Sequence, residues 1–177
     1  MNYFSLFKLP TAFEIDLSVL DSQLRALQTQ YHPDVIDSKT DNKTSHRQSE
    51  QMSAVINQGY QTLRYPDSRA SHLLALVGQD AHIQDSIYDL DFLDLAMDFR
   101  IRLDDADAQQ LPSLQKQMQD WLAQLSNDFT QAYHQQDWQS AIDATQKLQF
   151  LVKIDKDISK KMDKSSQIDT LDDDLYV

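Results

Sequence analysis

The chain has 177 residues, a formal net charge of −12, no cysteine, and only 2 glycines and 4 prolines. Tight turns usually need glycine or proline, so this composition argues against β-sandwiches, barrels and α/β folds and favours long helices. The absence of cysteine excludes disulfides, zinc fingers, iron–sulfur ligation by this chain and thiol catalysis. A negative surface repels phosphate, which makes nucleic acid and anionic membranes poor candidate partners.

The first part of the chain predicts a short helix followed by a helical hairpin. An apolar cluster at residues 3–7 predicts one or two helical turns. Leucines recur at helical spacing over 20–31, and after a polar loop at 37–45 a second apolar stripe follows over 52–63. A further short helix is expected between Pro66 and Gly78, because proline suits the first turn of a helix and glycine suits its end.

The second part predicts a bundle of three longer helices after a linker at 79–85. Short connections between long helices make neighbours antiparallel and favour a bundle. We therefore expect an all-α fold with two domains, an N-terminal domain at 1–78 and a bundle at 86–163. The acidic and polar residues at 164–177 predict a disordered tail. The helices of the bundle are expected at 86–106, 112–134 and 138–162.

The tripeptide His32–Pro33–Asp34 directly follows the first long helix. Proline lacks a backbone donor and disfavours helical geometry at the residue before it, so the helix must end here. The corner then presents an imidazole and a carboxylate on a rigid backbone. One reading is a helix stop that happens to carry two polar neighbours. Its place at the head of a hairpin loop, behind a short aromatic helix, favours a functional reading.

A short first helix and a hairpin loop headed by this tripeptide resemble a J-domain, which activates ATP hydrolysis by DnaK-type chaperones. More specifically, the chain resembles the HscB family, J-type co-chaperones of bacterial iron–sulfur cluster assembly. The motifs that carry this resemblance are Tyr3–Phe4–Leu6–Phe7, Gln30–Tyr31–His32–Pro33–Asp34, Ile56–Asn57–Gln58, Thr62–Leu63–Arg64, Arg69–Ala70 with Leu73–Leu74, and Lys147–Leu148 with Phe150–Leu151.

The resemblance implies a co-chaperone that is not itself an enzyme. It would stimulate the ATPase of the chaperone HscA and deliver the scaffold protein IscU to it. His32, Pro33 and Asp34 would dock on the chaperone, with Asp34 pairing with a chaperone arginine. The helix before the tripeptide offers only Arg25 where this family usually has several basic residues. We therefore expect weaker electrostatic steering toward the chaperone than is usual in the family, and a larger contribution of Arg25 to that steering.

The predicted helix at 86–106 is apolar on two sides. A bundle helix needs one apolar stripe toward its neighbours, so the second stripe either packs elsewhere in the chain or meets a partner. At about 100° per residue, the two stripes are centred roughly 160° apart. One stripe contains Phe92, Leu95, Ala96, Phe99, Leu103 and Ala106, and the other contains Leu90, Leu93, Met97 and Ile101.

In the HscB family the scaffold-binding surface lies on the first and last helices of the bundle. The resemblance carries this role to Leu93, Met97, Asp98 and Phe150. Three positions depart from the family pattern: Asp94 replaces an apolar residue, Ile101 replaces an acid and Gln149 replaces the usual arginine.

Beyond these residues the chain shows no motif for catalysis or for metal binding. No histidine has metal-ligand spacing and no serine lies in a nucleophile motif. We expect no cofactor, no metal, no nucleic acid and no membrane as partners. With neither a spanning segment nor a secretory signal, a cytoplasmic location is expected. Two alternatives stay open, a J-domain protein that serves another client and a helical adaptor unrelated to chaperones.

Overall fold

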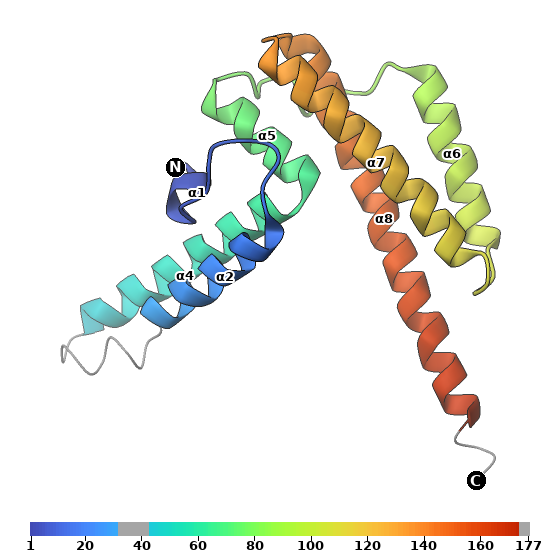
Figure 1. The fold of residues 1–177 in the computed structure, drawn as a ribbon, viewed down its shortest axis with the longest axis horizontal. Coiled ribbons are helices and arrows are strands. Elements are labelled where there is room, and N and C mark those ends of the chain that lie inside the picture. The colour runs from blue at the N-terminus through green and yellow to red at the C-terminus, as the bar shows by residue number, and fades with distance from the viewer. Residues whose placement is uncertain (32–42, 174–177) are drawn as a thin grey trace. The chain divides into compact units, whose positions relative to one another are not determined.

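The structure, a computed structural model, describes residues 1–31 and 43–173, with side chains described in 1–31 and 49–165. Every regular element in these ranges is a helix, which confirms the all-α prediction (Figure 1). The chain forms two compact units, Met1–Asp80 and Ala81–Val177, and the boundary lies within the linker expected at 79–85. In the part of the chain that is described, no helix has the length and apolar character needed to cross a membrane.

The first unit contains a short helix, a hairpin and one further helix. The two helices of the hairpin run antiparallel (Figure 1). The short first helix packs against the second helix of the hairpin. The helices described in this unit are α1 (Tyr3–Leu6), α2 (Leu17–Gln30), α4 (Lys43–Arg64) and α5 (Pro66–Leu76).

Helix α2 begins at an aspartate cap. The side chain of Asp16 accepts hydrogen bonds from the backbone amides of Ser18, at 2.8 Å, and Val19, at 3.3 Å. The Ser18 hydroxyl donates to the same carboxylate, and these hydrogen bonds hold the pKa of Asp16 below its usual value. Two otherwise unpaired amides at the start of the helix are thus satisfied.

Helix α1 is anchored by two phenylalanines and by a close approach to α4. Phe4 and Phe7 are fully buried. A Cβ atom on Gly59 of α4 would lie 2.8 Å from Cδ1 of Tyr3 and 3.0 Å from Cε2 of Phe7. On the other side, the Tyr3 backbone amide donates to Nε2 of His72 at 3.2 Å. Glycine at position 59 therefore gives α1 the room to pack against α4.

A buried arginine joins the segment before α2 to the end of α4. Arg69 lies over the ring of Phe13, with its guanidinium carbon 5.0 Å from the ring centroid. It donates to the backbone carbonyl of Leu63 at 3.1 Å. Burial lowers the pKa of Arg69 to about 10, and nearby Asp67 opposes this shift. The side chain is therefore still a cation at neutral pH.

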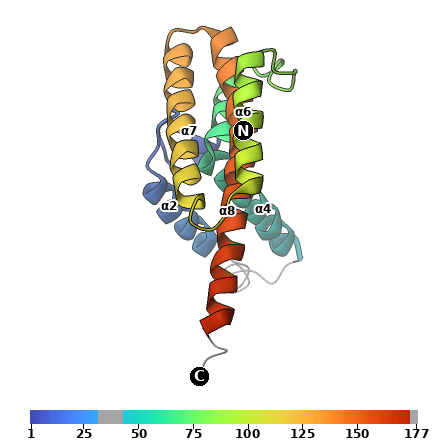
Figure 2. The same cartoon turned by 90° about the vertical axis from the view of Figure 1, so that its right-hand side faces the viewer.

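The second unit is built from three helices, of which the first and last run in the same direction while the middle one runs antiparallel to both (Figure 2). The last helix continues past 163, where the sequence led us to expect the start of a disordered tail. The helices are α6 (Leu90–Asp105), α7 (Leu111–His134) and α8 (Trp138–Asp173).

Helix α6 begins later than the start expected at residue 86. Asp89 is its N-cap, and Oδ1 of Asp89 accepts a hydrogen bond from the Phe92 amide at 3.0 Å. A cap of this kind sets the first helical residue by satisfying an amide in the first turn. Apolar periodicity alone cannot detect the cap, so it placed the start too early.

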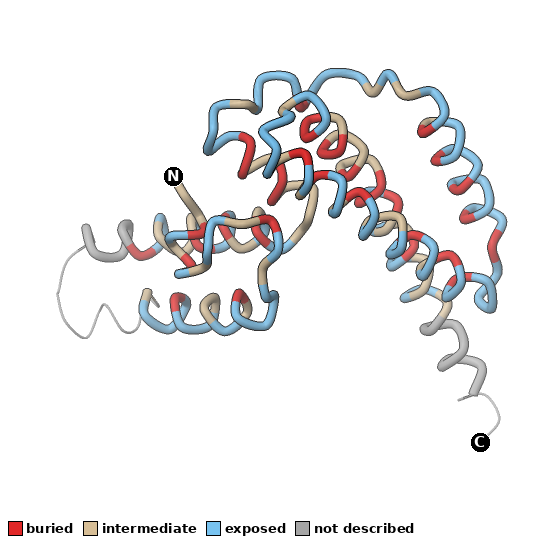
Figure 3. The backbone as a smooth tube through the Cα atoms, turned by 45° about the horizontal axis from the view of Figure 1, so that its top comes forward, coloured by how far each residue is buried: buried red, intermediate tan, exposed pale blue. Residues whose placement is uncertain are grey.

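One face of α6 supplies the core of the second unit. Its buried positions recur along the helix, with exposed positions between them (Figure 3). The ring of Phe92 packs edge-on to Trp121 of α7, with centroids 5.5 Å apart. Leu95, which the sequence grouped with the buried stripe, is 60% exposed, so the contact face is narrower than predicted. The buried apolar residues of α6 are Phe92, Ala96, Phe99 and Leu103.

We predict that Gly59→Ala destabilises the protein although alanine is the better helix former by about 1 kcal/mol. The added methyl group must displace the Tyr3 ring, and overpacking of this kind costs about 1–3 kcal/mol. The exposed neighbour Asn57 provides the control, since Asn57→Ala adds helix propensity without a clash. Urea unfolding followed by circular dichroism measures both. An equal gain in stability for the two variants would contradict the packing of α1 on Gly59.

Candidate partner-binding surfaces

The first candidate surface surrounds the end of α2. The residues His32, Pro33 and Asp34 lie outside the described residues. Helix α2 ends at Gln30 with Tyr31 as its C-cap, immediately before the tripeptide, as the proline rule predicts. Arg25 is exposed on α2 and is the single basic residue of that helix.

Polar contacts between α2 and α4 fix the chain that leads into the tripeptide. The hydroxyl of Ser49, a buried residue of α4, donates to the backbone carbonyl of Tyr31 at 2.7 Å. This bond satisfies a carbonyl at the end of a helix that has no partner within the helix. It also ties the residue before His32 to the second helix of the hairpin.

A second polar cluster lies toward the other end of the hairpin. The Tyr60 hydroxyl donates to Oδ1 of Asp21 at 2.8 Å. Arg64 donates in turn to the Tyr60 hydroxyl, and this hydrogen bond raises the pKa of Arg64. Arg64 also lies 3.8 Å from the Asp21 carboxylate. These contacts and the Ser49 bond hold α2 and α4 together at two separate points along the hairpin.

The second candidate surface is a line of exposed apolar side chains on α6. Leu90 is 72% exposed, Met97 55% and Ile101 57%. At about 100° per residue these three positions lie within roughly 40° of one another, on the side opposite the buried face. We call Leu90, Met97 and Ile101 the α6 ridge. In the free chain the predicted second stripe therefore faces solvent along most of its length.

The predicted scaffold-binding residues lie around this ridge. Leu93 is half-buried, and helical rotation places it on the side of the ridge that faces α8. Phe150 of α8 is also half-buried, and its ring packs edge-on to Phe92 with centroids 6.0 Å apart. Asp98 is exposed on the opposite side of the ridge. Met97 belongs to the ridge itself, so the four residues span it from edge to edge.

The side of the ridge away from α8 is acidic. Asp94, Asp98 and Asp105 are all exposed, and helical rotation places them along this edge. The nearest cation on α6 is Arg102, which donates to Oε1 of Gln117 at 3.2 Å and stacks over Phe99. An apolar line with an acidic border suits a partner whose own apolar surface is flanked by lysine or arginine. The role of Asp94 and Asp105 in this border was not foreseen from the sequence.

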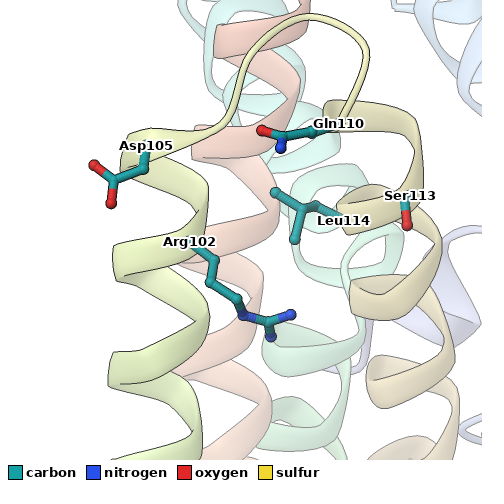
Figure 4. A pocket seen from close by; sticks show the side chains of 5 residues that line it. All are labelled: Arg102, Asp105, Gln110, Ser113 and Leu114. Carbon is teal, nitrogen blue, oxygen red and sulfur yellow. The ribbon is translucent and has the colours of Figure 1, made fainter.

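A hollow of about 370 Å³ lies beside the loop between α6 and α7 (Figure 4). Two of its polar lining groups already have partners within the fold: Arg102 donates to Gln117, and Oε1 of Gln110 accepts from the Asp107 amide at 3.0 Å. Among the described residues no cluster of histidine and acidic side chains is suited to hold a metal ion. The hollow is lined by Arg102, Asp105, Gln110, Ser113 and Leu114.

Comparisons with known proteins connect both units to one family. The family model described as the HSCB C-terminal oligomerisation domain matches residues 88–159. The co-chaperone protein HscB homolog of Acinetobacter baumannii is 41% identical over 164 residues, covering 92% of this chain and 91% of that protein. The homolog of Acinetobacter baylyi is 40% identical over 99% of this chain and 100% of its own length. The solved structure of chaperone HscB from Vibrio cholerae superimposes with a TM-score of 0.76 at 33% identity, covering 93% of this chain and 99% of that chain.

We predict that Met97→Ala and Phe150→Ala differ in their effect on the stability of the protein. Met97→Ala should change the free energy of unfolding by less than about 0.5 kcal/mol, because the side chain is exposed. Phe150→Ala should cost about 1–2 kcal/mol, because it removes a half-buried ring and its contact with Phe92. Urea unfolding of the two single variants measures both. A large loss for Met97→Ala would show that the ridge is covered in the free protein.

Proposed function

This chain belongs to the HscB family of co-chaperones, and from that premise we propose that it brings the scaffold protein IscU to the chaperone HscA. Co-chaperones of this family act in iron–sulfur cluster assembly. They activate the ATPase of HscA and catalyse no reaction of their own. The observation that carries the proposal for the scaffold is the exposure of the α6 ridge in a chain that matches its relatives over nearly their whole length.

At the chaperone end, His32, Pro33 and Asp34 dock on HscA, and Asp34 pairs with a chaperone arginine. A contact of this kind activates the ATPase only if it is stronger in the hydrolysing state of the chaperone than in its resting state. The bond from Ser49 to the Tyr31 carbonyl supports this role, because it fixes the backbone just before the tripeptide. Arg25 contributes a long-range attraction to an acidic chaperone surface.

At the scaffold end, IscU covers the α6 ridge together with Leu93 and Phe150. Covering exposed apolar side chains supplies the main driving force for association. Asp98 and its acidic neighbours then orient the partner by pairing with its basic residues. Because HscA consumes ATP, we infer that the complex forms in the cytoplasm.

The first test measures ATP hydrolysis by HscA with this protein, with and without IscU. We expect the protein alone to stimulate hydrolysis and IscU to add a synergistic increase. His32→Gln should remove the stimulation, because the substitution removes the imidazole from the proposed docking corner. Met97→Ala, in the second unit, is the matched control, and it should keep the stimulation seen without IscU.

The outcomes separate the readings that the sequence left open. If His32→Gln removes the stimulation but IscU adds no synergy, the second unit serves another client. No stimulation of any DnaK-type chaperone would contradict the co-chaperone mechanism itself.

The second test concerns steering by Arg25. We expect Arg25→Ala to weaken stimulation about two- to tenfold at low ionic strength, through slower association with HscA. The difference should shrink at about 0.5 M salt, where charges are screened over a few ångströms. Lys116→Ala removes the same charge from an exposed position on α7 and should have no effect. Unchanged stimulation by Arg25→Ala at low salt would contradict the steering account.

A further inference from the structure

The helix that carries the ridge is held at its first turn by a lysine from α8. Nζ of Lys147 lies 2.6 Å from Oδ2 of Asp89 and 2.7 Å from Oδ2 of Asp143. The other oxygen of Asp89 accepts from the Phe92 amide and caps α6. One carboxylate therefore links Lys147 on α8 directly to the first turn of α6.

Both members of this link are charged at neutral pH. The hydrogen bond from Lys147 and that from the Phe92 amide hold the pKa of Asp89 below its usual value. Burial alone would lower the pKa of Lys147, whose side chain is only 14% exposed, but Asp143 and Asp89 outweigh burial and raise it. The Lys147 ammonium also lies 5.5 Å from the centroid of the Phe92 ring. The ammonium group is thus enclosed by acceptors and by the aromatic ring that anchors α6.

The other end of α6 is held by a second lysine from α8. Nζ of Lys161 donates to the backbone carbonyl of Leu103 at 2.7 Å and to that of Asp104 at 2.8 Å. The last carbonyls of a helix have no partner within the helix. They also carry the negative end of the helix dipole, so a cation is favourable there. Lys161 therefore serves as a C-terminal cap for α6 that comes from a different helix.

The spacing of these contacts allows only one alignment of the two helices. Asp89 and Leu103 are fourteen residues apart on the chain, and so are Lys147 and Lys161. Helices α6 and α8 run in the same direction (Figure 2). At about 1.5 Å per residue both intervals span roughly 21 Å, so both lysines reach their acceptors together. A shift of one helical turn, about 5.4 Å, would separate both pairs at once.

One further polar contact between the two helices is described. Arg100 lies 3.4 Å from Asp157, but both side chains are about half exposed. An exposed pair of this kind contributes little. Two charge-assisted contacts at a fixed interval add a directional constraint to the apolar packing of α6.

We propose that Lys147 and Lys161 are positioning residues for scaffold binding, because they lock the register of α6 on α8 and so set where the α6 ridge lies relative to Phe150. This inference rests on the proposed function, since the scaffold is the partner that contacts both helices. Phe150 follows Lys147 by three residues and Leu93 follows Asp89 by four, so each lies about one helical turn further along its helix. The lysine contact therefore lies beside the part of the surface that both helices share.

The test measures IscU binding to full-length variants by calorimetry, well below the unfolding temperature. Lys147→Met and Lys161→Met keep the length of the side chain and remove the charge. We expect each to weaken IscU binding about tenfold. Lys161→Arg keeps the charge, so it should bind IscU nearly as well as the wild type does. Lys160→Met is the matched control, because Lys160 is exposed and pairs only with Asp157 of its own helix among the contacts described. It should bind IscU as the wild type does.

A purely structural role would give a different pattern. If the lysines place the ridge relative to Phe150, the loss caused by Lys161→Met should largely disappear in a Phe150→Ala background. An unchanged loss in that background, or wild-type binding by both methionine variants, would overturn the inference. If Lys147→Met fails to fold, Lys161→Met still decides the question, because the Lys161 side chain is only half-buried.

Amide exchange in α6 separates this inference from the proposed function. The double lysine variant should exchange faster at both ends of α6 while α7 is unchanged. If the wild-type protein does not bind IscU, the proposed function fails and the positioning role fails with it. If the wild type binds IscU and the double variant shows neither faster exchange nor weaker binding, only the positioning role fails.

Discussion

The second unit depends on how α6 divides its apolar side chains. Phe92, Ala96, Phe99 and Leu103 are buried against the other two helices, while the α6 ridge stays in water. Exposed apolar residues are ordinary when they are scattered singly, but three in line along one helix form a surface suited to a partner. Burial of such side chains contributes about 1.5–3 kcal/mol each, before the cost of association is deducted. In the proposed function, the scaffold covers these side chains on the exposed face of α6.

The first unit is held together by close packing at a glycine and by a few hydrogen bonds between its helices. In the proposed function this unit presents the three residues that follow α2, and other residues hold the unit together. Phe4 and Phe7 anchor α1 against α4, where Gly59 leaves space for them. The bonds from Ser49 to Tyr31 and from Tyr60 to Asp21 then join the two helices of the hairpin. Arg25 is exposed on α2 and takes no part in this packing.

Periodicity and proline placement were enough to predict the helices and the all-α class, because apolar spacing reports directly which face of a helix is buried. They could not predict the N-cap at Asp89 or the exposure of Leu95, since both depend on which side of α6 its neighbours occupy. The sequence left open whether the second stripe of α6 was covered, and the structure places its ridge in solvent. The lysine contacts were also hidden, because Lys147 and Lys161 each lie 58 residues further along the chain than the acceptor they reach, and such a separation has no local signature. The tripeptide itself lies outside the described residues, so its geometry stays a prediction.

In the proposed function, the α6 ridge is open in the free protein and covered by the scaffold in the complex. Methyl NMR of Met97 and Ile101, recorded with a soluble paramagnetic agent, tests it most directly. The account predicts strong paramagnetic broadening of both methyl groups in the free protein, protection when IscU is added, and no protection when HscA is added alone. Methyl groups that are already protected in the free protein, or that stay accessible in the complex with IscU, would contradict it.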